Sequence, residues 1–127
     1  MQEHSAAVTR RQTRRTAART TPIDPERMSR KAREAANFLR AIANEHRLLI
    51  LCHLHRGEMS VGALADQLGL RQAHLSQQLS VLRADGLVQA RRESRMVHYS
   101  LASPAAAAVI ERLYQLFCQE RPTDGPG

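Results

Sequence analysis

The chain has 127 residues, 43% of them hydrophobic and only 3% aromatic, so it has room for one compact domain with a largely aliphatic core. This length speaks against a multi-domain enzyme, and we expect neither catalytic residues nor a cofactor. The formal net charge is +7, from 19 Lys and Arg against 12 Asp and Glu, and every cation except Lys31 is arginine. Because guanidinium groups match phosphate oxygens, this balance favours a nucleic-acid partner over a merely soluble basic protein.

The sequence contains no run of about 18 apolar residues, and its N-terminus lacks the apolar centre of a secretory signal. We therefore expect a cytoplasmic protein with no membrane span. Thiols stay reduced in that compartment, so Cys52 and Cys118 are predicted to be free at rest.

Residues 1–24 hold five arginines and almost no large apolar side chain, which predicts a disordered basic N-terminal arm. One interpretation is that the arm follows the DNA backbone or enters a minor groove. The alternatives are a solvated extension, or an over-long start with Met28 as the true beginning. Residues 122–127 are predicted to form a flexible tail. One domain is expected between these ends, over residues 25–121.

Two helices open this domain. Asp24 suits the cap and Pro25 the first position of a helix over residues 25–43. Its apolar residues share one face, which predicts that this face is buried: Ala35, Phe38, Leu39 and Ile42. Asn44 caps a second helix over residues 45–56, which is apolar almost all round and therefore belongs in the middle of the domain.

A helix-turn-helix unit follows. Ser60 caps a short third helix, and Gly69 supplies the left-handed residue that ends it. Only about two residues later a fourth helix begins, over residues 71–84, although Arg71 is a poor cap. Two helices joined by so short a turn are typical of DNA-binding proteins.

The rest of the domain is predicted to be a hairpin and a final helix. Residues 87–91 and 96–101 favour strands around a polar tip, in which Ser94 stands where Gly would be expected. Ser103 and Pro104 begin a last helix, apolar on one wide face, that ends before Pro122. The fold class is mainly α with a small β-hairpin, a winged helix-turn-helix in the order α-α-α-α-β-β-α.

The fourth helix carries the candidate DNA-reading face. Its leucines lie on one side, and its opposite side is small, polar and free of acids, whereas a merely solvated face usually carries Glu and Lys. Gln bonds adenine, Ser meets bases or phosphates, and Ala packs on thymine methyls, so the face suits a major groove. It consists of Ala73, Ser76, Gln77 and Ser80, flanked by Gln72, His74 and Gln78.

The hairpin tip carries Arg91, Arg92 and Arg95, which are predicted to contact phosphates or a minor groove, with Glu93 orienting one of them. The alternative is a solubilising charged turn.

The chain resembles the ArsR/SmtB repressor family. The resemblance lies in the order of its elements and in three stretches, residues 43–48, 64–70 and 75–83. The resemblance covers roughly residues 30–120. It implies a homodimer formed by the first and last helices, which binds a double-stranded operator of two-fold symmetry and releases it when an inducer arrives.

Metal-sensing members of this family carry a Cys-x-Cys pair at the start of the third helix or an Asp/His set on the last one. Residues 60–64 and 103–108 contain neither. A metal-responsive repressor therefore stays only an alternative, because the family's metal-binding residues are missing from these positions. We expect no metal site.

Cys52 on the second helix and Cys118 on the last resemble instead the BigR/SqrR branch, in which one thiol on each helix reacts with persulfide and a short sulfur chain links them. The resemblance implies that reactive sulfur species, persulfide or polysulfide, bridge Cys52 and Cys118 and release the operator. A thiolate that attacks a sulfur, followed by resolution by a second thiol, is sound chemistry without the resemblance.

Four alternatives stay open. The cysteines form a plain disulfide in a general thiol-oxidant regulator, or they only fill space in the core. A thiol oxidoreductase would want a Cys-x-x-Cys motif, whereas these cysteines stand 66 residues apart. The fourth alternative is an architectural DNA-binding protein with no inducer.

Overall fold

A computed structural model of the chain describes residues 21–119. The predicted arm lies outside these residues except for its last four, and the predicted tail over residues 122–127 lies wholly outside them. The described residues fall into two parts, with the division between Ala35 and Ala36. In the stretch 21–119, no helix is long and apolar enough to cross a membrane.

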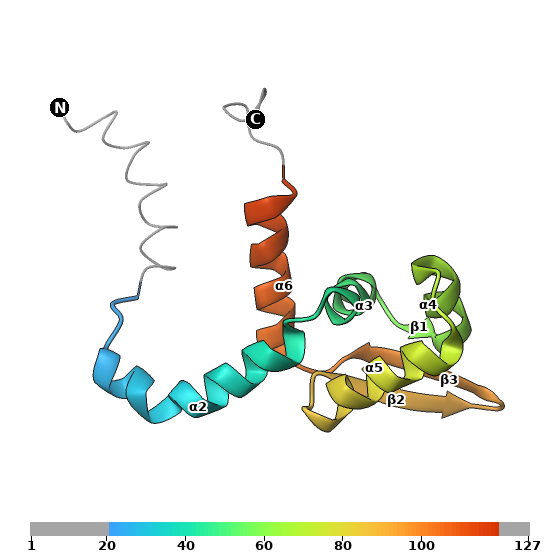
Figure 1. The fold of residues 1–127 in the computed structure, drawn as a ribbon, viewed down its shortest axis with the longest axis horizontal. Coiled ribbons are helices and arrows are strands. Elements are labelled where there is room, and N and C mark those ends of the chain that lie inside the picture. The colour runs from blue at the N-terminus through green and yellow to red at the C-terminus, as the bar shows by residue number, and fades with distance from the viewer. Residues whose placement is uncertain (1–20, 120–127) are drawn as a thin grey trace. The chain divides into compact units, whose positions relative to one another are not determined.

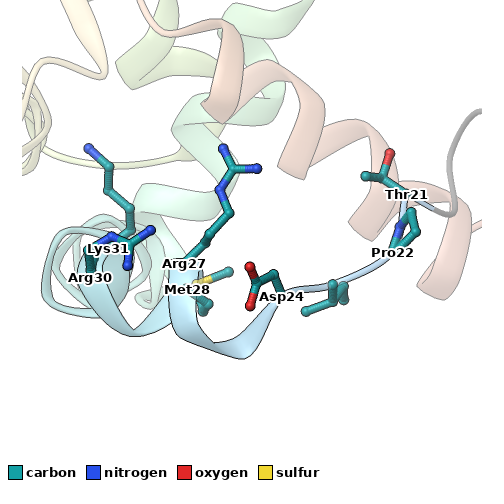
Figure 2. A pocket seen from close by; sticks show the side chains of 8 residues that line it. Thr21, Pro22, Asp24, Arg27, Met28, Arg30 and Lys31 are labelled. Atoms are coloured by element: carbon teal, nitrogen blue, oxygen red, sulfur yellow. The ribbon is translucent and has the colours of Figure 1, made fainter.

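The described residues of the first part form the start of helix α2 (Pro25–Ile42). Asp24 caps it as predicted, because its Oδ1 accepts a hydrogen bond of 3.0 Å from the backbone N–H of Glu26. Figure 2 shows this helix start and the open hollow of about 470 Å³ beside it, with Arg27 and Lys31 pointing to the same side.

The second part contains the end of α2 and the other helices and strands found among residues 21–119 (Figure 1). The helices are α3 (Glu45–His55), α4 (Val61–Leu68), α5 (Gln72–Ala84) and α6 (Pro104–Phe117). The strands are β1 (Met59–Ser60), β2 (Val88–Glu93) and β3 (Met96–Leu101). The predicted mainly α, winged helix-turn-helix class is confirmed.

Local capping explains where most of these helices begin and end. Asn44, Ser60 and Ser103 each accept a hydrogen bond from the backbone N–H three residues on, at 3.1, 3.1 and 3.0 Å. Gly69 ends α4 in the left-handed conformation, with φ of 66°. These four predictions are confirmed. Arg71 caps α5 with no side-chain hydrogen bond, as its chemistry suggested.

The sheet has one strand more than predicted. Its antiparallel order is β1-β3-β2, and the two-residue strand β1 pairs Met59 with Tyr99. Strand β2 also continues to Glu93, beyond the predicted end at residue 91, because Glu93 still pairs with Met96. The turn therefore has only two residues, and Ser94 adopts a left-handed φ of 58°.

The core is aliphatic, as the composition predicts. Its largest fully buried side chains are Ile50, Leu51, Leu64, Leu75, Leu79 and Leu82. Helix α3 packs against α4, α5, α6 and β3, which confirms its predicted place in the middle of the domain.

Two predicted apolar faces are only partly buried. Leu39 of α2 is 55% exposed, because Ala41 and Ile42 form the buried end of that helix instead. On α6 the core receives Ala106 and Ile110, whereas Phe117 near the C-terminal end of the helix is 80% exposed. Within the single chain, the predicted burial of this face of α2 is seen at Ile42 and not at Leu39.

Replacing Ser94 with Gly should stabilise the hairpin, because a left-handed φ strains a residue with a Cβ atom. We expect Ser94→Gly to raise the free energy of unfolding by up to about 1 kcal/mol, measured by urea denaturation. Ser100→Gly in β3 is the control, and we expect it to lower stability. A less stable Ser94→Gly protein would contradict this explanation of the turn.

Candidate functional site

Helix α5 presents a polar face to solvent because its other side is anchored in the core. Leu75, Leu79 and Leu82 are all 0% exposed. Five of the seven predicted reading residues are exposed on the opposite side: Gln72, Ala73, Ser76, Gln77 and Ser80. The structure therefore brings these five together on one surface, which we call the α5 face.

The other two predicted reading residues, His74 and Gln78, are half-buried at the edge of this surface. Gln78 accepts a hydrogen bond of 2.9 Å from Arg47 of α3, and its amide nitrogen lies 3.2 Å from His74. The rings of His74 and His46 meet edge to face, with 4.8 Å between their centres. Both residues thus contact α3 within the chain.

Two carboxylates, those of Glu58 and Glu93, bind Arg91 within the chain. Its guanidinium donates hydrogen bonds of 3.0 and 2.8 Å to Glu58 and one of 3.2 Å to Glu93. The hydrogen bond from Arg91 lowers the pKa of Glu58 below its ordinary value. The predicted role of Glu93 in orienting an arginine is thus confirmed, while sequence reasoning missed Glu58.

Arg92 and Arg95 are exposed, and within the stretch 21–119 neither forms an ion pair. Arg95 also helps to line an open hollow of about 420 Å³ that Gln72 and Ser76 of the α5 face line from the other side. The hairpin tip and the α5 face are therefore neighbours, although they stand far apart in the sequence.

The two cysteines open into one groove of about 620 Å³ between α3 and α6. Both are free thiols, with Cys52 half-buried in α3 and Cys118 exposed at the end of α6. Arg56, Tyr114 and Gln115 line the same groove. The structure thus joins two residues that the sequence separates.

Burial raises the pKa of the Cys52 thiol above its ordinary value, and the negative charge of a Cys118 thiolate raises it further. Cys52 therefore holds its proton more firmly than a free thiol, and an attacking thiolate forms there less readily.

A hydrogen bond between side chains joins α3 and α6 beside the cysteines. Nε2 of His55 lies 2.9 Å from a carboxylate oxygen of Glu111. Sequence reasoning missed Glu111, although the signal was present: His55 follows Cys52 by three residues and Glu111 precedes Cys118 by seven, so each shares a helix face with its cysteine.

Among residues 21–119, no group of three or more His, Cys, Asp or Glu side chains could hold a metal ion.

Comparison with known proteins identifies the family. Residues 44–90 match the model of the bacterial regulatory protein, arsR family. The transcriptional activator HlyU of Vibrio cholerae is 46% identical over 98 residues, which cover 77% of this chain and 91% of HlyU. The chain belongs to the arsR family.

Two further relatives of this arsR-family chain are repressors by name. The biofilm growth-associated repressor of Agrobacterium fabrum is 47% identical over 91 residues, covering 72% of this chain and 78% of that protein. The crystal structure of the transcriptional repressor BigR from Xylella fastidiosa matches with a TM-score of 0.73 at 41% identity, covering 77% of this chain and all of that one. The chain is accordingly a transcriptional regulator by family, and these relatives are not enzymes.

The environment of the two thiols predicts unequal reactivity. At mildly alkaline pH, iodoacetamide should modify Cys118 several times faster than Cys52, because Cys118 is exposed whereas burial raises the pKa of Cys52. Time-resolved peptide mass mapping measures both rates, and the urea-unfolded protein is the control in which the difference should vanish. Faster modification of Cys52 in the folded protein would contradict this environment.

Proposed function

We propose that this chain is a dimeric, DNA-binding transcriptional repressor that releases its operator when reactive sulfur species bridge Cys52 and Cys118. The observation that carries the sensing part is that both thiols, one from each of two packed helices, line a single groove.

The α5 face supports the DNA-binding part. It is exposed, polar and free of acids, and amide, hydroxyl and methyl groups of this kind match base edges in a major groove. Arg71 leaves the first N–H groups of α5 without a side-chain cap, so they stay available to a phosphate oxygen. Arg92 and Arg95 add cations on the hairpin.

Exposed apolar side chains support a dimer. Four large apolar side chains are between 48% and 80% exposed: Leu39 of α2, and Tyr114, Leu116 and Phe117 of α6. A second copy related by two-fold symmetry would remove such side chains from water. The Agrobacterium relative is named a repressor, and we extend that sign of regulation to this chain.

The proposed bridge forms from organic persulfides, R–S–SH, which supply both the extra sulfur and the oxidising equivalents. Each cysteine thiolate attacks the outer sulfur of one persulfide, gains an S–S bond and expels the thiolate RS⁻. The two cysteine persulfides then condense to Cys–S–S–S–Cys and release H₂S. Cys118, the exposed thiol, is placed to react first, and the half-buried Cys52 completes the bridge.

A bridge would act on DNA binding through helix placement. It fastens α6, which belongs to the proposed dimer interface, to α3 in the domain core. Two reading helices must match half-sites about one DNA turn apart, so a small change in their spacing lowers operator affinity. A coupling free energy of about 1–3 kcal/mol changes affinity by roughly 5- to 150-fold.

The cysteine variants test sensing. Sodium tetrasulfide should lower the affinity of the wild-type protein for a duplex that it selects from a randomised pool. Cys52→Ser and Cys118→Ser should bind the same duplex normally and lose this response, because neither can close a bridge. Fluorescence anisotropy measures binding, and sodium sulfide, which carries no sulfane sulfur, is the matched control reagent.

Mass spectrometry of the treated protein decides the chemistry. A link between Cys52 and Cys118 that contains one or more extra sulfur atoms supports persulfide sensing. A plain disulfide, formed equally with hydrogen peroxide, would replace it with a general thiol-oxidant regulator. An unchanged response in both serine variants would overturn sensing by these thiols.

The hairpin arginines should differ in their effect on salt dependence. Arg92→Ala and Arg95→Ala should each reduce the slope of log affinity against log salt by about 1, because each removes a phosphate contact. Arg91→Ala should leave that slope nearly unchanged, since Arg91 is already paired with Glu58 and Glu93. Titrations with a scrambled duplex at several KCl concentrations measure the slopes, and an equal loss for Arg91→Ala would show that it contacts DNA.

A further inference from the structure

Arg47 lies where three helices meet. It belongs to the first turn of α3, yet its Nε donates to the carbonyl oxygen of Ala41 at 2.6 Å and its Nη2 to that of Arg40 at 3.3 Å. Those carbonyls stand in the last turn of α2, where a helix leaves its acceptors open. Nη1 donates to Oε1 of Gln78 on α5 at 2.9 Å. One half-buried cation therefore fastens α5 to the ends of two other helices.

This contact fixes the orientation of the Gln78 amide. A guanidinium only donates, so the atom facing Arg47 is the amide oxygen, and the amide nitrogen points elsewhere. That nitrogen lies 3.2 Å from Nε2 of His74, one turn earlier on α5. Because an amide nitrogen only donates, Nε2 of His74 is the acceptor of this hydrogen bond. Both polar atoms of Gln78 thus have partners inside the chain.

We propose that Arg47 is a positioning residue for DNA recognition, which holds α5 in its reading orientation through Gln78, and that Gln78 reads no base. The inference rests on the proposed DNA-binding function. It departs from the sequence-based expectation, in which Gln78 and His74 flank the reading face and contact bases.

Gln77 and Gln78 make the contrast sharp, because two adjacent glutamines lie in different environments. Gln77 is exposed on the α5 face, whereas Gln78 is half-buried and bonded to Arg47. If Gln78 turned to a base, an N–H group of the half-buried Arg47 guanidinium would lose its hydrogen-bond acceptor. An unsatisfied donor on a charged, half-buried group costs free energy. Gln77 can turn to a base edge without such an exchange.

The test compares Arg47→Met, Gln78→Ala and the double variant, with Gln77→Ala as the matched control. The probe is a fluorescein-labelled duplex that the wild-type protein selects from a randomised pool. Arg47→Met and Gln78→Ala should each weaken binding about tenfold, as expected for loss of a hydrogen bond to a charged group. The double variant should be no weaker than Arg47→Met, and repeated selection should return the wild-type base preference. Gln77→Ala should change the preferred base at one position.

A second measurement needs no DNA. In ¹⁵N spectra of the free protein, Arg47→Met should shift the side-chain amide signals of Gln78 and leave those of Gln77 in place, while circular dichroism confirms that the variant is folded. If the wild-type protein selects no duplex, the DNA-binding proposal fails, and these spectra still decide whether Arg47 holds Gln78.

Four results would overturn the inference. The first is that Gln78→Ala changes the preferred base, as is expected for Gln77→Ala. The second is that the double variant loses about a hundredfold in affinity for the duplex, because multiplied losses mark independent contributions. Arg47→Met could reduce the salt slope by about 1, which would make Arg47 a phosphate contact. Unmoved Gln78 amide signals would show that the contact is absent.

Discussion

The burial of three leucines on one side of α5 is the constraint on which the rest of the structure depends. Leu75, Leu79 and Leu82 are fully buried, and each such side chain contributes about 1.5–3 kcal/mol by leaving water. A helix of 13 residues is only marginally stable alone, so this packing both forms α5 and fixes its rotation about its axis. With the leucines inward, the small polar residues of the α5 face have to point outward.

Helix α3 connects the two functional regions of the domain. Cys52 on α3 lines the groove that Cys118 of α6 also lines, and Arg47 in the first turn of α3 is bonded to α5. The core residues between them, Ile50 and Leu51, are fully buried, so α3 is tightly held along this length. Close-packed interiors transmit small displacements, so in the proposed switch a change at the groove would reach α5 through α3.

Local chemistry made much of the fold predictable, since Asn44, Ser103 and Gly69 act within one helical turn and the α5 leucines follow the helical period. The missed features all join segments far apart in the chain. Strand β1 needs β3 as its partner, and the pairs Arg91–Glu58 and Arg47–Gln78 form only after packing. The sequence named candidate site residues, but it did not predict that Gln78 and Arg91 are engaged within the chain. Periodicity marks the apolar face that includes Leu39 without saying what covers it, and within the single chain Leu39 is exposed.

Backbone amide mapping on a duplex at low salt tests the central claim, that the α5 face enters DNA, most directly. Titration of the ¹⁵N-labelled protein should shift the signals of residues 72–80 and of the hairpin tip around Arg95, while Asp66 and Gln67 on the exposed side of α4 change least. Largest shifts outside α5 and the hairpin, or no shift with any duplex even at low salt, would contradict the account.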